Sequence, residues 1–366
     1  MSNKKPTFID LFAGAGGLSI GIEQAGFRPL AATDWDHWSC ETLRANHKDM
    51  VVHEGDITSV DLEDFSKQIG ARTVDLIVGG PPCQGFSQLG KQKKDDPRNQ
   101  MWREYMRFVA FFKPKIFLME NVPQLLTSDE FPSIKKMAKE LEYEVREKVL
   151  HAVEYGVPQK RKRVIILGSK IGIPKHPEPT HTNPDDFNLL NGHLKSWATV
   201  KDAIGDLSLE PTGKDWHIGR NPTPTSLKRY KSIPPGGNRF DLPVALTPDC
   251  WKRKKTGSTD VFGRLKWDAP SLTIRTEFFK PEKGCYLHPQ AHRPITIREA
   301  ARLQTFPDKY VFIGSNVQVA KQIGNAVPCR LAYAVGKELF QLLNPSAYSV
   351  QNETVDRLAP LQRQLA

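Results

Sequence analysis

The first half of the sequence alternates short apolar runs with longer amphipathic stretches, and this alternation limits the chain to few folds. Parallel strands need crossover connections, so alternating strands and helices predict an α/β fold with a doubly wound, mostly parallel sheet. The expected strands are Thr7–Phe12, Leu30–Thr33, Val51–His53, Val74–Val78, Ile116–Met119, Tyr143–Leu150 and Val164–Leu167, and the expected helices are Gly17–Ala25, Trp38–Asn46, Trp102–Phe112 and Ser133–Leu141.

The sequence changes character near Pro174. Between Lys170 and Ile295 there are 20 Lys and Arg residues against 13 Asp and Glu residues. This stretch therefore contributes +7 to the total net charge of +11, and it also contains over half of the 28 prolines. Periodicity is weak in this stretch, which favours a smaller, loop-rich domain. We therefore expect a large domain at 1–172, a small domain at 173–294, a hinge and return segment at 295–318, and the C-terminal part of the large domain at 319–366.

Composition excludes several classes of protein. Hydrophobic residues form 39% of the chain, which argues against disorder, and no apolar run approaches the roughly 18 residues of a membrane span. The polar first residues predict no signal peptide. The five cysteines are odd in number and form no CxxC pair, so we expect no disulfide framework, no metal site and a cytoplasmic protein. The basic surplus suggests an anionic macromolecular partner, although charge alone is equally explained by solubility.

A glycine-rich turn follows the first expected strand, in Asp10-Leu-Phe-Ala-Gly-Ala-Gly-Gly. Glycines let a ligand approach the backbone, and the next helix offers free N–H groups. Asp34 and Asp56 end the second and third strands, so the three strand ends line one crevice. Each aspartate alone is better explained as a helix cap, but together they favour a nucleoside site.

Two further strand ends carry reactive side chains. Cys83 follows Gly-Gly-Pro-Pro, a rigid turn that presents a thiol to the crevice, and Glu120 ends the next strand. A buried structural cysteine fits this polar surrounding badly, whereas Glu120 taken alone is better explained as a helix cap or a surface acid. In Gln159-Lys-Arg-Lys-Arg163, strand alternation places Gln159, Arg161 and Arg163 on one face. That face could hold an anion or orient the acid, but a solvated edge strand is equally compatible with the spacing.

These residues belong to a series of short motifs near both ends of the chain: Phe-Ala-Gly-Ala-Gly-Gly (12–17), Asp-Trp (34–35), Gly-Asp-Ile (55–57), Gly-Pro-Pro-Cys-Gln-Gly-Phe-Ser (80–87), Glu-Asn-Val (120–122), Gln-Lys-Arg-Lys-Arg (159–163), Arg-Glu-Ala-Ala-Arg-Leu-Gln-Thr-Phe-Pro-Asp (298–308) and Gln-Ile-Gly-Asn-Ala-Val-Pro (322–328). The series resembles the DNA (cytosine-5) methyltransferase family of prokaryotic restriction–modification type. The resemblance implies a Rossmann-like methyltransferase fold and leaves 168–294 for target recognition.

The resemblance also implies the chemistry. Cys83 would add to carbon 6 of cytosine, Glu120 would meet ring nitrogen 3, and Arg163, with Arg161, would hold the base oxygen. S-adenosylmethionine would supply the methyl group. The cofactor contacts implied by the family are Phe12, Ala13, Gly14, Gly16, Gly17, Asp34, Trp35, Asp56, Ile57, Asn325, Ala326 and Val327.

The substrate implied is double-stranded DNA, whose target base must leave the helix before a side chain reaches carbon 6. The candidate DNA contacts are Gln159, Lys252, Arg253, Lys254 and Lys255, although an isolated charge run more often forms a solvated loop. We expect a monomer without membrane attachment, associated with the nucleoid through DNA, and a cognate restriction endonuclease is possible.

Three rival functions remain at this point. An RNA cytosine-5 methyltransferase would share the chemistry but would need a shorter recognition segment. A nicotinamide dinucleotide oxidoreductase would have a GxGxxG turn, whereas Gly14, Gly16 and Gly17 give GxGG, and it leaves Cys83 and Glu120 unexplained. A catalytically inactive DNA-binding protein would have no reason to keep the thiol and the acid.

Overall fold

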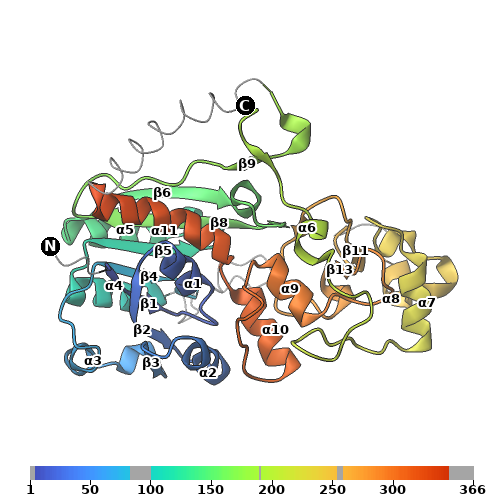
Figure 1. Ribbon diagram of the computed structural model, residues 1–366, viewed down its shortest axis with the longest axis horizontal. Coiled ribbons are helices and arrows are strands. Elements are labelled where there is room, and N and C mark those ends of the chain that lie inside the picture. The colour runs from blue at the N-terminus through green and yellow to red at the C-terminus, as the bar shows by residue number, and fades with distance from the viewer. Residues whose placement is uncertain (1–4, 83–99, 189–190, 254–258, 346–366) are drawn as a thin grey trace, which may run out of the picture.

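The structure, a computed structural model, describes residues 5–82, 100–188, 191–253 and 259–345. Its main feature is a seven-stranded sheet in the order β3-β2-β1-β4-β5-β8-β6 (Figure 1). The strands are β1 (Thr7–Leu11), β2 (Arg28–Asp34), β3 (Val51–Glu54), β4 (Leu76–Gly79), β5 (Ile116–Asn121), β6 (Glu144–His151) and β8 (Lys162–Ser169).

Neighbouring strands from β3 to β5 are parallel, whereas β8 is antiparallel to both β5 and β6. The prediction of a mostly parallel sheet is therefore confirmed. The order reverses direction at β1, where β2 and β4 lie on either side, and such a switch point leaves a crevice outside the carboxyl ends of the strands.

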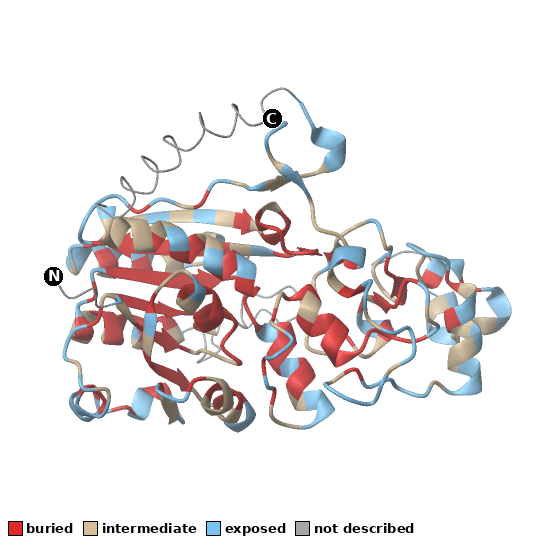
Figure 2. Cartoon of the chain, in the orientation of Figure 1, coloured by how far each residue is buried: buried red, intermediate tan, exposed pale blue. Residues whose placement is uncertain are grey.

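Helices cover both faces of the sheet and bury its apolar strands, which form the red centre of Figure 2. One face packs against α3, α4 and α5, and the other against α1 and α11, with α2 beside β2. These helices are α1 (Gly17–Gln24), α2 (His37–Asn46), α3 (Leu62–Gln68), α4 (Met101–Phe112), α5 (Glu130–Glu140) and α11 (Cys329–Leu343). The sequence did not predict the short helix α3, although Asp61 caps it by accepting from the N–H of Asp64.

The chain between β8 and α11 has little regular structure and lies beside the sheet in Figure 1. Its elements are β9 (His181–Thr182), β10 (Lys195–Ser196), α6 (Val200–Ile204), α7 (Pro224–Ser232), α8 (Asp249–Lys252), β11 (Gly263–Arg264), β12 (Ser271–Leu272), β13 (Cys285–Leu287), α9 (Ile297–Leu303) and α10 (Asn316–Asn325). The strand β12 pairs with β7 (Gln159–Lys160), a short strand that precedes β8. Two apolar clusters hold it, one around Phe278, Ile297 and Ile323 and a smaller one around Tyr230 and Phe262. The larger cluster also includes Ile20 of α1, so this region packs against the sheet-covering helices. The division into domains at 173 and 294 stays a prediction.

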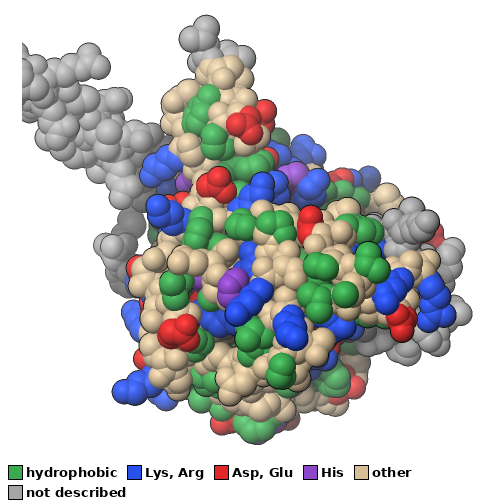
Figure 3. Space-filling view, turned by 90° about the vertical axis from the view of Figure 1, so that its right-hand side faces the viewer, with side chains coloured by type: hydrophobic (Ala, Val, Ile, Leu, Met, Phe, Trp, Pro, Cys, Tyr) green, Lys and Arg blue, Asp and Glu red, His purple; other side chains and the backbone are tan. Residues whose placement is uncertain are grey.

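Figure 3 views the end of the molecule that this region forms, where Lys and Arg side chains are distributed among apolar ones. Within the described part of the chain, no helix combines the length and the apolar character required to cross a membrane.

Candidate active site

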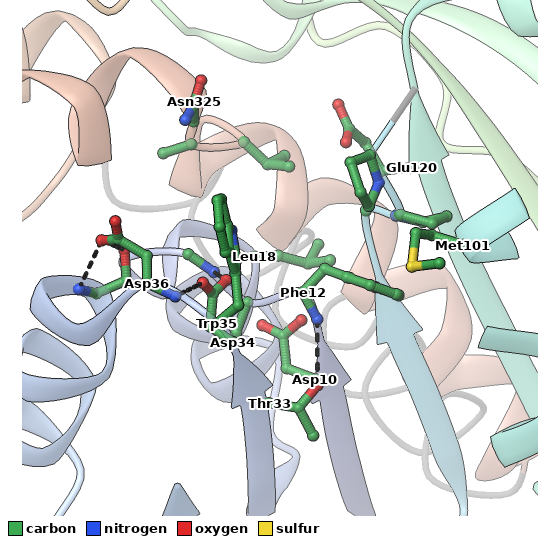
Figure 4. A pocket seen from close by; sticks show the side chains of 18 of the residues that line it. Asp10, Phe12, Leu18, Thr33, Asp34, Trp35, Asp36, Met101, Glu120 and Asn325 are labelled. Carbon is green, nitrogen blue, oxygen red and sulfur yellow. Dashed lines mark hydrogen bonds between the residues drawn. The ribbon is translucent and has the colours of Figure 1, made fainter. Parts of the chain in front are cut away.

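A cavity of about 930 Å³ opens at the carboxyl ends of the central strands (Figure 4). Its walls come mainly from the ends of β1, β2, β4 and β5, from the segment after β3, and from α10 and the segment that joins it to α11. The lining residues are Asp10, Phe12, Ala13, Gly14, Leu18, Thr33, Asp34, Trp35, Asp36, Ser39, Gly55, Asp56, Ile57, Gly80, Pro81, Pro82, Met101, Glu120, Asn121, Val122, Arg163, Lys321, Gln322, Asn325, Ala326 and Val327. The cavity therefore combines most of the predicted cofactor contacts with Glu120 and Arg163.

The glycine-rich turn between β1 and α1 is shaped by left-handed backbone. Gly14 and Gly16 have φ values of 53° and 75°, which glycine adopts without strain. A Cβ on Gly17 would lie 2.4 Å from the carbonyl oxygen of Val327, so only glycine lets the two segments meet. Gly16 and Gly17 thus do not line the cavity themselves, but they allow the turn and the Val327 segment to form adjoining walls.

The acidic residues at the ends of β2 and β3 have different partners. Asp34 accepts hydrogen bonds from the N–H groups of Gly14, at 2.7 Å, and Asp36, at 2.8 Å, and burial raises its pKa. Asp56 accepts from the N–H of Thr58 and so caps the short helix η1 (Ile57–Ser59). Beside them the Trp35 side chain is 78% exposed although it lines the cavity. Asp34 thereby fixes the glycine turn, while Asp56 is both a cap and a cavity residue.

Asp10 is a site residue that the sequence analysis did not select. Ser19 donates a hydrogen bond to its Oδ2 at 2.6 Å, whereas Oδ1 is buried and has no hydrogen-bond partner among the described residues. Burial raises the pKa of Asp10 to about 7. Its position at the end of the first strand, just before the glycine turn, was the signal that could have identified it.

Glu120 and Arg163 form an ion pair, with 2.6 Å between Oε1 and Nε and side chains 11% and 15% exposed. Asn121 donates from Nδ2 to the carbonyl oxygen of Pro81 at 2.9 Å. A Cβ on Gly80 would lie 2.9 Å from Oε2 of Glu120. The turn leading to position 83 therefore packs directly on the acid, while Cys83 itself lies outside the described residues.

The structure corrects the roles predicted for Gln159 and Arg161. Gln159 is 0% exposed and bonds to Leu303, Gln304 and the N–H of Ile274, so no atom remains for DNA. Arg161 is buried, does not line the cavity, and donates to the carbonyl oxygens of Ile274 and Gly324 at 3.1 and 3.2 Å. The alternation was predicted correctly, but only Arg163 of this face reaches the cavity, because the two others connect chain segments.

The predicted DNA contacts Lys252 and Arg253 are exposed at the end of α8, and Lys252 pairs with Asp249. Lys254 and Lys255 lie outside the described residues. His37, Glu41 and Glu54 come close enough to ligate a cation, but Arg44 already lies 2.7 Å from a carboxylate oxygen of each glutamate. Their geometry is thus explained by a guanidinium that bridges both carboxylates.

Comparisons with known proteins agree with this geometry. The model of the C-5 cytosine-specific DNA methylase family matches residues 6–341. The Type II methyltransferase M1.HphI of Haemophilus parahaemolyticus is 36% identical over 92% of this chain and 87% of its own length. The Type II methyltransferase M.Eco47II of Escherichia coli is 36% identical over 94% and 81%.

The fold is also that of solved methyltransferases. A prophage-encoded E. coli protein, assigned as a DNA modification methyltransferase, has a TM-score of 0.67 and 26% identity, with 93% of this chain and 99% of that chain covered. The Entamoeba histolytica methyltransferase EhMeth has a TM-score of 0.68 at 16% identity, with 93% and 100% covered, and shows the fold alone. The chain therefore belongs to the family of C-5 cytosine-specific DNA methylases.

Proposed function

We propose that the protein transfers a methyl group from S-adenosylmethionine to carbon 5 of a cytosine within a specific duplex DNA sequence. The observation that carries this proposal is the Glu120–Arg163 ion pair, which shares one cavity with the Pro81–Pro82 turn that precedes Cys83. A nicotinamide oxidoreductase would leave that arrangement without a role. The matching family model describes DNA methylases, which supports DNA over RNA as the substrate.

The cavity suits S-adenosylmethionine in charge and size. The cofactor carries a sulfonium and an ammonium group, and the walls include Asp10, Asp34 and Asp56. The Oδ1 atom of Asp10, which has no partner within the described part of the chain, is a buried acceptor available to a cationic group. Trp35 offers an exposed ring face to a flat base. The cavity volume of about 930 Å³ lies near the upper end of the range for ligand pockets. Bound there, S-adenosylmethionine supplies the methyl group.

The side chains divide the remaining chemistry. The Cys83 thiolate adds to carbon 6 of the cytosine, which makes carbon 5 nucleophilic. Glu120 stabilises this adduct at ring nitrogen 3, and Arg163 holds Glu120 in place and faces the base oxygen. After methyl transfer, loss of the carbon 5 proton and departure of the Cys83 thiolate restore the aromatic ring. Arg161 acts at a distance, because it fixes the backbone of Gly324 next to the cavity.

DNA recognition is assigned to the region 173–294, which carries most of the excess positive charge. The target cytosine must be rotated out of the duplex to reach the cavity. Lys252 to Lys255 are the candidate phosphate contacts there. We further propose a monomer that works at the nucleoid, where its substrate is, either beside a cognate restriction endonuclease or as an orphan methylase.

Covalent trapping tests this function. Duplex DNA with 5-fluorocytosine at the target should form a stable adduct with the protein and S-adenosylmethionine, because fluorine cannot leave as the proton does. Cys83→Ser should abolish both adduct and turnover but keep cofactor binding, whereas the control Cys250→Ser, at an exposed position, should keep all three. An adduct on another cysteine, or trapping on RNA but not on DNA, would contradict the proposal.

A further inference from the structure

The helix α10 forms one wall of the cavity and is joined to α2 on the opposite side by contacts between residues far apart in sequence. Thr42 donates to the side chain of Gln322 at 2.9 Å, and Lys321 forms a 2.9 Å ion pair with Asp36. Asn46 and Val311 continue the same interface with two hydrogen bonds. The contacts with Thr42 and Asn46 are neutral, and the contact with Asp36 is ionic.

The ion pair lies at the edge of the cavity. Lys321 and Asp36 both line it, with side chains 46% and 20% exposed. The Lys321 Nζ also lies 5.6 Å from the centre of the Trp35 ring. A single ammonium group therefore contacts both the acid and the exposed aromatic ring beside which a flat base would bind.

Asp36 links this edge to the rest of the site. It caps α2 by accepting from the N–H and Oγ of Ser39, and its own N–H donates to Asp34. Burial alone raises the pKa of Asp36, but the hydrogen bonds from Lys321 and Ser39 outweigh burial, so its pKa lies below the ordinary value. The carboxylate is thus charged at neutral pH and holds Lys321 from a rigid helix end.

We propose that the Lys321–Asp36 ion pair is a latch across the mouth of the cavity that slows the exchange of the cofactor. This inference rests on the proposed function, because it assigns the cavity to S-adenosylmethionine. A ligand between Trp35 and α10 leaves more easily when α10 and α2 separate, and the ion pair opposes that separation. Both residues are positioning residues, since neither reaches the cytosine chemistry.

Two substitutions remove the latch without removing the helix cap. Asp36→Asn keeps an acceptor for Ser39, because asparagine caps helices as well as aspartate does, and Lys321→Met keeps an unbranched side chain but removes the charged donor. We expect each to speed dissociation of S-adenosylmethionine, and of its demethylated product, by about fivefold in stopped-flow displacement. The double variant should be no faster than either single variant, and Lys321→Arg should remain close to the wild type.

The matched control is the exposed pair Lys67–Asp64, which has the same 2.9 Å separation on α3. Lys67→Met and Asp64→Asn should leave dissociation unchanged. Any of three results would overturn the proposed latch. These are unchanged dissociation rates in folded variants of Asp36 and Lys321, additive effects in the double variant, and a loss of DNA affinity confined to Lys321→Met. Failure of the wild type to bind S-adenosylmethionine would instead contradict the proposed function.

Discussion

Glu120 and Arg163 meet where the parallel part of the sheet changes to the antiparallel part, with 2.6 Å between Oε1 and Nε. In the antiparallel ladder between β5 and β8, Asn121 lies opposite Val164. The start of β8 therefore lies at the carboxyl end of β5, where the cavity opens. A parallel β8 would place Arg163 at the far end of the sheet, so the reversed strand is what brings the guanidinium to the acid.

Replacing Glu120 by Gln tests this pair. The amide keeps the shape but can neither supply a proton nor neutralise Arg163, so kcat should fall by about 10²–10⁴-fold while duplex binding is retained. Tritium transfer from labelled S-adenosylmethionine measures the rate, and a gel-shift assay measures binding. The control is Glu147→Gln on the edge strand β6, which removes an ion pair with Lys135 of α5 and should leave kcat unchanged. Normal turnover in Glu120→Gln would show that Glu120 has a structural role and no catalytic one.

Asp10 predicts a pH dependence of stability. Its pKa is raised to about 7 in the folded chain, mainly by burial, so between about pH 4 and pH 7 the folded state keeps a proton that the unfolded state loses. The free energy of unfolding should therefore decrease as pH rises through this range, by up to about 1.4 kcal/mol per unit from this group, and level off above pH 7. Asp10→Asn should flatten that decrease in urea titrations, because an amide does not titrate.

The same carboxyl group should couple cofactor binding to proton release. A cationic group near Oδ1 favours the ionised form, so S-adenosylmethionine should bind more tightly as pH rises through 7. Calorimetry in two buffers of different ionisation enthalpy measures the released proton. Asp10→Asn should bind weakly and release none, and an unchanged release would assign the proton to another group.

The sequence predicted the sheet and four of the helices that cover it, α1, α2, α4 and α5, because strand and helix periods are local properties. The direction of β8 was not predictable from apolar spacing, which is the same in parallel and antiparallel strands. Gln159 and Arg161 were placed on the correct face, but their partners Ile274, Gln304 and Gly324 lie more than 110 residues away. Local pattern cannot distinguish a face that lines a cavity from one that packs against a distant segment. Lys321 was missed for the same reason.

The buried contacts of Gln304 predict an effect on the cofactor site. Its Nε2 donates to the carbonyl oxygens of Ile323 and Ala326, at 2.6 and 3.3 Å, next to cavity residues. Gln304→Glu removes both of these hydrogen bonds and places a carboxylate oxygen, which can only accept, next to the two carbonyl oxygens. Leaving buried polar groups unsatisfied in this way lowers the free energy of unfolding by about 1–3 kcal/mol. We expect a lower melting temperature and a higher KM for S-adenosylmethionine.

The control for Gln304 is Gln290→Glu, the same change at an exposed position, which should alter neither quantity. The two measurements also separate stability from positioning. A lower melting temperature with an unchanged KM would show that Gln304 supports the fold without shaping the cofactor site.

The basic segment 252–255 predicts how the protein holds DNA. Contacts with phosphates are independent of sequence and release counterions, so neutralising Lys252, Arg253, Lys254 and Lys255 should weaken binding to specific and unrelated duplexes alike. The slope of log affinity against log salt concentration should decrease by about 0.9 for each lost phosphate contact.

A matched control neutralises the exposed Lys135, Lys136, Lys139 and Lys148 of α5 and β6, which changes the net charge equally. Fluorescence anisotropy at several salt concentrations measures both slopes. If the two variants weaken binding equally, the effect comes from net charge and not from contacts at 252–255. A loss confined to the specific duplex would instead mean that this segment reads bases.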